Sequence, residues 1–374
     1  GDPNQVIYSW RGSAFQIFFQ LKNRYQAMIT QHAWMSLASY EKLRNKLQNA
    51  CIVNMAHLGA RAFEDVSGEM VQTTSFVLMN VHIKGTEGVY CRLIDGTNAQ
   101  EKETAFFATV NRFIAKQDSF EKIPGAPVSA YVAGDTLATL YQNGQTISKI
   151  GDVKIGMGTG NNDLFLKSWW EIEEGKIDYS ITDKSQLDYS NKKYFPYSKG
   201  GERWYGNHEF VIWFNRSGQN KMKQTSGHRE NGGYDFYFHK GITWSYSTMA
   251  PFSVRIMPTG FVFDVNGSSL FLPEQYYNYV LCFLQSCVGR FIIDSIKSAF
   301  SIQAGTIRNL PVIGNTTPKI EALANECVTL SQQDWDSYET SWDFKGHPLV
   351  LGRLPEPVWG DVPDKVAFQN TSLS

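Results

Sequence analysis

The sequence predicts an α/β protein with an open sheet over residues 25–115, followed by a mixed α+β domain over residues 151–315. Two observations favour this fold class. Residues 25–80 contain a strand-like apolar segment, an amphipathic helix and two further strand-like segments, the order in which an open α/β sheet closes. The second stretch is rich in Gly, Trp and Tyr, and its short apolar runs are separated by turn residues, which is typical of short strands.

Size and composition support well-packed cores. The chain has 374 residues, of which 42% are hydrophobic, so it is long enough for two domains and is not expected to be disordered. Because 35 Lys and Arg stand against 36 Asp and Glu, bulk charge does not attract nucleic acid, and DNA binding would need local basic and aromatic patches. No signal peptide and no apolar run of membrane-spanning length is found, so we expect a cytoplasmic protein with no membrane partner.

The elements of the first part follow from periodicity. Met28–Ile29 begins a buried strand, and the next segment predicts a helix with Leu43 and Leu47 on its apolar face and Arg44 on its solvent face. The remaining elements are predicted as strands and a final helix: Ile52–Met55, Thr74–Met79, Val89–Ile94 and, as a helix, Ala99–Ala115.

Residues 116–150 are predicted to be a connector, because Pro and Gly break the pattern before a short helix at Thr136–Tyr141. In the second domain we expect strands at Phe210–Phe214, Ile242–Ser247, Ser253–Met257 and Gly260–Asp264. We expect helices at Pro273–Cys287 and Val288–Ser295. Residues 316–374 are expected to form a helix over Pro318–Tyr338 and a tail.

The cysteines indicate no zinc site, because none of the five form a CxxC pair. Cys51 and Cys282 lie in apolar runs, so we interpret them as reduced core residues. No other spacing of His, Cys or carboxylates predicts a metal.

The second domain carries the residue types that bind DNA. Cations and aromatic residues alternate around a Gly-containing loop at residues 195–205, and further polar residues follow. Arg and Lys suit guanine edges or phosphates, Asn suits adenine, and Thr or Ser serves either. The candidate DNA-binding residues are Lys199, Arg203, Trp204, Tyr205, Arg229, Asn231, Lys240, Thr243 and Ser245. The alternative is that the Trp and Tyr residues fill a β-rich core.

The glycines Gly156, Gly158 and Gly160 follow a predicted short strand. They form a poor dinucleotide-binding fingerprint, because the segment after them does not look like a helix N-terminus. The other interpretation is a glycine-rich turn that lets the strand approach DNA closely.

Several longer phrases carry a resemblance to a known family. QHAWM, PYSKGGERWYGN, GITWS, GFVFDVNGSS and DWDSYETSWDF resemble stretches of the PglX proteins, large adenine-specific DNA methyltransferases of BREX phage-defence loci. The resemblance covers roughly residues 27–349. GTIRNLPV, which looks like a strand or turn stopped by Pro311, resembles the phrase that closes target-recognition domains in type I specificity subunits and TaqI-like methyltransferases.

The resemblance implies a fold and a function. It implies the later strands of a Rossmann-like methyltransferase sheet in residues 25–115 and a target-recognition (DNA specificity) domain in residues 151–315. The full-length family transfers a methyl group from S-adenosylmethionine to adenine N6 in double-stranded DNA, within a restriction-modification type defence system whose other subunits are further candidate partners. Neither a glycine-rich donor turn nor an NPPY loop is found in this chain. We therefore assign no catalytic residue and expect a fragment that is inactive alone and does not bind the donor well.

Three residues of the first part gain candidate roles from the resemblance. His32 follows a strand at the end where open sheets place binding residues. Phe63 matches the position of an aromatic that presses on the extruded base, and the planar fork of Arg61 suits a phosphate. The alternatives are a helix cap for His32, a core position for Phe63 and a solvated surface position for Arg61.

Two other functions remain open. The chain is either part of such an enzyme or a non-catalytic DNA-specificity module that positions a partner. A weaker alternative is a helicase fragment, because GDPNQVIYSWRGS at residues 1–13 resembles a motif of UvrD/Rep-type helicases that contributes Gln5, Tyr8 and Trp10. No phosphate-binding loop precedes this motif, so residues 1–24 are interpreted as an unrelated segment without ATPase activity.

Overall fold

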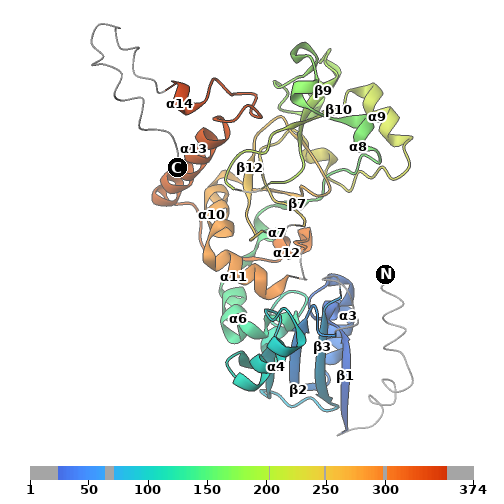
Figure 1. Ribbon diagram of the computed structural model, residues 1–374, viewed down its shortest axis with the longest axis vertical. Helices are drawn as coiled ribbons and strands as arrows, with labels where there is room; N and C mark the ends of the chain where they lie inside the picture. Colours follow the sequence, from blue (N-terminus) through green and yellow to red (C-terminus); the bar gives the residue numbers. More distant parts are fainter. Residues whose placement is uncertain (1–23, 64–70, 202, 248–249, 298–300, 352–374) are drawn as a thin grey trace, which may run out of the picture.

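The computed structural model describes residues 24–63, 71–201, 203–247, 250–297 and 301–351. These residues form a mixed α/β fold drawn out along one axis (Figure 1). A five-stranded sheet lies at one end, helices α10, α11 and α12 lie in the middle, and two four-stranded sheets form the other end. The helicase-like motif at residues 1–13 lies outside the described residues.

The first part contains a mixed five-stranded sheet in the order β1-β3-β2-β4-β5. Its strands are β1 (Tyr25–Gln31), β2 (Cys51–Gly59), β3 (Thr73–Met79), β4 (Glu87–Arg92) and β5 (Arg112–Lys116). β3 is antiparallel to both β1 and β2, so β1 and β2 run in the same direction. β4 is parallel to β2, and β5 closes the sheet antiparallel to β4.

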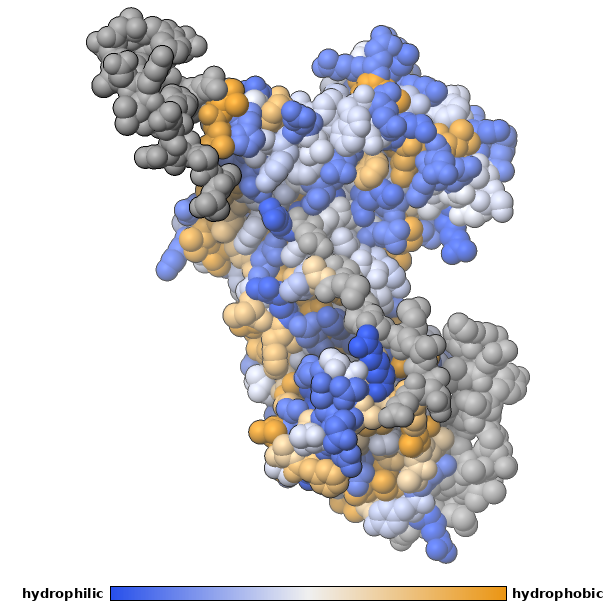
Figure 2. All heavy atoms as spheres, in the orientation of Figure 1, coloured by the Kyte–Doolittle hydropathy of each residue, from blue (hydrophilic) through white to orange (hydrophobic). Residues whose placement is uncertain are grey.

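The two faces of this sheet differ. One row of apolar side chains crosses all five strands and packs into the core: Met28, Phe76, Met55, Tyr90 and Phe113. On the opposite face the strands expose apolar side chains, with Ile29 60% and Ile114 68% exposed. Figure 2 shows apolar side chains gathered over the part of the molecule that holds this sheet, whereas the other end is predominantly polar.

The helices of the first part correct two sequence predictions. Arg44, predicted on the solvent face of α3 (Glu41–Leu47), is buried and donates hydrogen bonds to the carbonyl oxygens of Gly125, Trp34 and Leu37. The predicted helix Ala99–Ala115 ends early: α4 spans Ala99–Ala108, and Thr109 adopts a left-handed conformation (φ 60°) that turns the chain into β5.

Residues 116–150 are packed against the first sheet. Phe120, Ile123 and Tyr131 are buried in the same core as the sheet. Their elements are α5 (Gln117–Phe120), η3 (Val128–Val132), α6 (Gly134–Asn143), β6 (Gln145–Thr146) and α7 (Ile147–Ile150).

The second part contains two mixed or antiparallel sheets. One has the order β13-β9-β10-β8, with β13 parallel to β9, and the other has the order β12-β11-β14-β7. The strands are β7 (Asp152–Lys154), β8 (Leu166–Ser168), β9 (Tyr194–Ser198), β10 (Phe210–Trp213), β11 (Gly241–Thr243), β12 (Arg255–Met257), β13 (Val262–Phe263) and β14 (Ser269–Phe271). Pro311, predicted to stop a strand, instead begins β15 (Pro311–Val312), which pairs with β6 after the short helix α12 (Ala304–Arg308).

Helices near the carboxyl end brace this part. α10 (Glu274–Gln285) packs against α11 (Cys287–Ile296) and against α13 (Pro318–Trp335). The shorter helices are α8 (Asn162–Phe165), α9 (Arg216–Lys223) and α14 (Pro348–Leu351). Among the described residues no single helix is long and apolar enough to cross a membrane, although α10 and α11, bent by 74°, pass that test as a pair.

Two main cores hold the described residues together. The larger core joins the first sheet to α10, α11 and the sheet containing β11 and β14, through residues such as Trp34, Leu281 and Trp244. The smaller core lies around β9, β10 and β13 and is rich in Phe and Tyr. Cys51 is a buried free thiol as predicted, whereas Cys282 is only half-buried.

Candidate nucleic-acid interface

The loop 200–207 carries three of the predicted DNA-binding residues, and its backbone is unusual. Gly200, Arg203, Gly206 and Asn207 all have left-handed φ angles, of 91°, 69°, 110° and 59°. Such angles are unfavourable for Arg and moderately so for Asn, so surrounding contacts must hold the loop in place.

Those contacts come from β12 and α13. The buried Arg255 guanidinium donates to the Gly206 carbonyl, and it also donates to Ser198 Oγ at 3.1 Å. Gly201 lies so close to Arg255 that a Cβ there would stand 2.5 Å from the guanidinium carbon. On the other side, the Tyr205 N–H donates to Ser331 Oγ of α13 at 3.3 Å. The sequence therefore places a glycine, Gly201, where this buried arginine leaves no room for a side chain.

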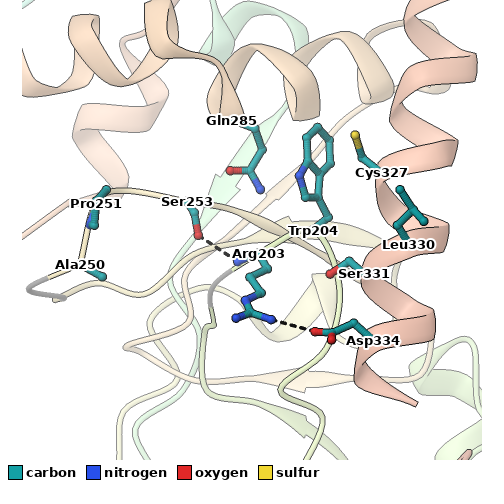
Figure 3. Close-up of a pocket in the computed structure, with 10 residues that line it drawn as sticks. All are labelled: Arg203, Trp204, Ala250, Pro251, Ser253, Gln285, Cys327, Leu330, Ser331 and Asp334. Atoms are coloured by element: carbon teal, nitrogen blue, oxygen red, sulfur yellow. Dashed lines mark hydrogen bonds and ion pairs between the residues drawn. The ribbon is translucent and has the colours of Figure 1, made fainter. Parts of the chain in front are cut away.

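Within this frame, Arg203 and Trp204 point to opposite sides of the loop (Figure 3). The Arg203 guanidinium is 73% exposed and donates through Nη1 to Asp334 Oδ2 on α13 at 2.8 Å. Trp204 is half-buried and packs against the larger core. Both residues line an open cleft of about 520 Å³, whose other walls come from Ala250, Pro251, Ser253, Gln285, Cys327, Leu330, Ser331 and Asp334.

Tyr205 lies next to a buried aromatic cluster. Its ring contacts His208 edge-on at 4.9 Å, and His208 in turn stacks on Trp342. Burial, followed by the nearby carboxylates Asp336 and Asp343, raises the pKa of Tyr205 to about 12. Burial and the Arg255 charge hold the pKa of His208 well below its ordinary value, so this imidazole is neutral. Tyr205 thus anchors the loop on its inner side.

Arg229 and Asn231 do not lie on the loop 200–207 but beside the glycine run, which comprises Gly156, Gly158 and Gly160. The backbone of Arg229 bridges Gly158, and Asn231 Nδ2 donates to the Gly156 carbonyl at 3.0 Å. Both side chains are exposed. Gly156 packs closely against β13, where a Cβ would lie 2.1 Å from the Phe263 carbonyl oxygen, and the predicted approach of this turn to DNA stays a prediction.

The two lysines among the predicted DNA-binding residues, Lys199 and Lys240, each lie over an aromatic ring. Lys199 Nζ lies 4.9 Å from the centroid of the Phe210 ring, and Lys240 Nζ lies 4.0 Å from that of Tyr277. Lys240 also forms an ion pair with Glu274, with 3.6 Å between Nζ and Oε1. These cation–π contacts orient the ammonium groups while leaving them partly exposed.

Thr243 and Ser245 are placed differently. Thr243 is fully buried in β11, where its hydroxyl donates to the carbonyl oxygens of Gly267 and Ser268. It is therefore a core residue in this structure and cannot reach a base edge. Ser245 is half-buried just beyond the strand.

In the first part, His32 is buried in a chain of polar side chains. Its Nδ1 lies 2.8 Å from His57 Nε2, and His57 Nδ1 lies 3.2 Å from the Tyr131 hydroxyl. Burial lowers the pKa of His32 to about 4, and burial together with His32 and nearby cations lowers that of His57 to about 3. The pair is neutral at pH 7, and each imidazole donates through one nitrogen only.

Arg61 and Phe63 are exposed, and Arg61 has a left-handed φ of 56°. Phe63 is 46% exposed, so the core alternative for this residue is wrong. His32 sits at the carboxyl end of β1, as predicted, but its side chain faces His57 in the interior.

Sequence reasoning missed the residues that hold the loop. Arg255 lies in a predicted strand with no sign of its burial, and Asp334 lies in an acidic stretch that looks like a solvated helix end. The role of Arg255 is revealed only by its contact with the loop from β12, and the role of Asp334 only by the contact of α13 with the loop. Two of the family-like phrases, PYSKGGERWYGN and DWDSYETSWDF, meet at this contact.

Comparisons with known proteins place the chain. No protein-family model matches it. It is 36% identical over 338 residues to the adenine-specific methyltransferase PglX of Lacticaseibacillus casei (strain Zhang), a match that covers 87% of this chain and 28% of that protein. It is 36% identical over 339 residues to the adenine-specific methyltransferase BrxX of Escherichia coli O9:H4 (strain HS), covering 88% of this chain and 27% of that protein.

A solved structure shares the fold. The Type IIL restriction-modification enzyme MmeI, solved in complex with DNA, superposes with a TM-score of 0.53 at 11% identity, over 91% of this chain and 46% of that one. At this identity the likeness shows the fold alone. The sequence matches confirm the resemblance to PglX proteins: the chain is a homologue of the PglX and BrxX adenine-specific methyltransferases, spanning 27–28% of their length.

Proposed function

We propose that this chain carries the DNA target-recognition part of an adenine-specific DNA methyltransferase of a phage-defence system, together with the closing strands of its catalytic sheet. The observation that carries the proposal is the 36% identity to PglX and BrxX across almost nine tenths of the chain. Because these relatives are about three and a half times longer than the matched segment, the complete activity belongs to the longer protein.

The first sheet supports the second half of the proposal. β1 and β2 run in the same direction with β3 antiparallel between them, a pattern suited to the closing edge of an otherwise parallel sheet. β1 is an end strand that exposes Tyr25 (67%) and Ile29 (60%). Such an edge is unfavourable when left open, so we infer that further strands and helices of a full-length enzyme cover it.

The second part supplies the proposed DNA-binding residues, which lie in more than one place. Arg203 and Trp204 lie on the loop 200–207, Arg229 and Asn231 lie beside the glycine run, and the remaining residues are Lys199, Lys240 and Ser245. Arg203 and Lys240 are already paired with Asp334 and Glu274. Because these two cations already have a carboxylate partner, we expect few phosphate contacts from them and a modest salt dependence of DNA binding.

S-adenosylmethionine is the donor in the proposed full-length reaction. The glycine run at residues 156–160 does not fit it: Gly156 packs against the Phe263 carbonyl, and the helix that follows, α8, has only four residues. No step through the donor is derived for this chain, and donor binding is assigned to another part of the longer enzyme.

Duplex binding tests the proposal. Fluorescence anisotropy with labelled 30-base-pair duplexes should be measured from low to physiological salt. The logarithm of the association constant should fall linearly with the logarithm of the salt concentration, with a slope of about −0.9 for each phosphate contacted. A mixture of random sequences should bind more weakly than an enriched site. Absence of duplex binding at low salt would remove the proposed function.

The non-catalytic specificity module is the second candidate, favoured by the absence of the donor turn and NPPY loop from the sequence. Radiolabelled S-adenosylmethionine separates the two: we expect no methyl transfer by the chain alone and transfer by the longer enzyme that contains it. If the longer protein also transfers no methyl group to an enriched site, the specificity module is the better description.

A further inference from the structure

Arg203 is held by a backbone hydrogen bond and one ion pair at an open surface. The backbone of Arg203 and Trp204 is held by two hydrogen bonds, because the Arg203 N–H donates to Ser253 Oγ at 3.0 Å and the Trp204 carbonyl accepts from the Ile256 N–H at 2.9 Å. Its left-handed backbone then directs the side chain towards the mouth of the cleft. Ordering an arginine in this way before it meets a ligand lowers the entropy lost on binding.

Asp334 fixes the other end of the side chain. It lies in the last turn of α13, where a carboxylate is disfavoured by the negative end of the helix dipole. Its position is therefore not explained by helix stability, and its contact is with Arg203 Nη1. Within the described residues, Nε and Nη2 of Arg203 form no hydrogen bond, so one side of the guanidinium fork is presented to solvent.

This arrangement distinguishes base readout from phosphate binding. An aspartate 2.8 Å from the guanidinium cancels most of its charge and would repel a phosphate placed beside it. The same aspartate does not oppose a neutral base edge, and it orients the fork for two parallel hydrogen bonds. Bidentate contact of arginine with guanine O6 and N7 is the most common specific contact in the major groove.

We propose that Arg203 is a specificity-determining residue that reads a guanine edge, and that Asp334 is its positioning residue. The proposal rests on the proposed function of DNA target recognition. It assigns one position of the recognised sequence to guanine. It also gives the contact between the loop 200–207 and α13 a role in selecting sequence.

Selection from a pool of duplexes with a randomised central segment, followed by sequencing, tests the assignment. The variants are Arg203→Ala, Arg203→Lys and Asp334→Asn, with circular dichroism as a folding check. Arg216→Ala is the matched control, because Arg216 is similarly exposed (77%) and also paired with a carboxylate, Asp188, but lies on α9. Binding to the enriched site is then measured across salt concentration.

We expect wild type and Arg216→Ala to enrich the same site. Arg203→Ala should lose the guanine preference at one position and weaken binding to the enriched site roughly 10- to 100-fold, with the other positions unchanged. Arg203→Lys should show a similar loss of preference although the charge remains, because an ammonium lacks the fork. Asp334→Asn should lower the ratio of specific to non-specific binding.

Two results overturn the assignment while leaving the proposed function intact. One is a uniform weakening by Arg203→Ala across all sequences with a salt slope smaller by about 1, which marks a phosphate contact. The other is an enriched site unaffected by any change at Arg203 or Asp334. If the wild-type chain itself enriches no sequence, both the proposed function and the assignment fail.

Discussion

The buried His32–His57 pair predicts that the protein loses stability in mild acid. Both imidazoles are neutral in the folded protein, with pKa values of about 4 and about 3, against an ordinary value of 6.5 for an exposed histidine. Between these values the unfolded chain binds more protons than the folded one. The free energy of unfolding therefore falls as the pH decreases below 6.5 and is fully retained above it.

The size of the effect follows from the two pKa shifts. From pH 8 to pH 6 each histidine removes about 1 kcal/mol from the free energy of unfolding, so the pair removes roughly 1–2 kcal/mol. At pH 5 the loss is about 2 kcal/mol for each, because both remain neutral in the folded state there. This is a large fraction of the stability of an ordinary domain. The buried His208, whose pKa is also lowered, adds a loss in the same direction.

Urea unfolding followed by tryptophan fluorescence at pH 8, 7 and 6 measures this loss. The double variant His32→Gln/His57→Gln keeps hydrogen-bonding side chains at both positions and should show a pH-dependent loss smaller by roughly 1–2 kcal/mol between pH 8 and 6. The exposed His82→Gln is the control and should follow wild type. Parallel pH profiles for wild type and the double variant would refute the reasoning.

Three further substitutions test the packing, each by its free energy of unfolding. Arg44→Met leaves three carbonyl oxygens without their donor and should cost roughly 3–5 kcal/mol; a change below 1 kcal/mol would contradict the buried role. Gly156→Ala, whose Cβ meets the Phe263 carbonyl, should cost roughly 3 kcal/mol, whereas Gly175→Ala, with no atom within 4 Å, should be neutral. Thr243→Val should lower the free energy of unfolding by about 1–2 kcal/mol, because two carbonyl oxygens lose their donor. At a temperature where the variant is folded, its affinity for DNA should equal that of wild type. A loss of DNA affinity in the folded variant would show that Thr243 contributes to DNA binding.

Periodicity in the sequence predicts several strands, but it misses β9 and β14 and assigns most of β5 to a helix. The alternation that predicts a strand at Thr74–Met79 corresponds closely to β3. The predicted helix Ala99–Ala115 is too long, because the observed helix ends at Thr109 in a left-handed conformation. Gly or Asn usually occupies such a position. A threonine at that position gives no local signal.

The candidate site is predicted in its residue types but not in its contacts. The glycines and cations around Arg203 and Arg229 are visible in the sequence, and the structure leaves both arginines exposed. The burial of Arg44 and Arg255 depends on carbonyl groups supplied by distant segments. Helical periodicity predicts that Arg44 faces solvent, and strand alternation does not predict that Arg255 is buried. Neither pattern contains information about the distant backbone segments that pack against these side chains.

The larger core has a consequence for how this chain can change in evolution. Because side chains before residue 150, such as Met55 and Phe120, share one interior with Trp244 and Leu270, a crossover at residue 150 between two distant homologues would join halves that were never selected to fit. Exchange of short surface loops keeps that interior intact. If the proposed DNA recognition holds, new preferences for DNA sequence are expected to arise by replacement of surface loops, while the residues of the larger core are inherited together.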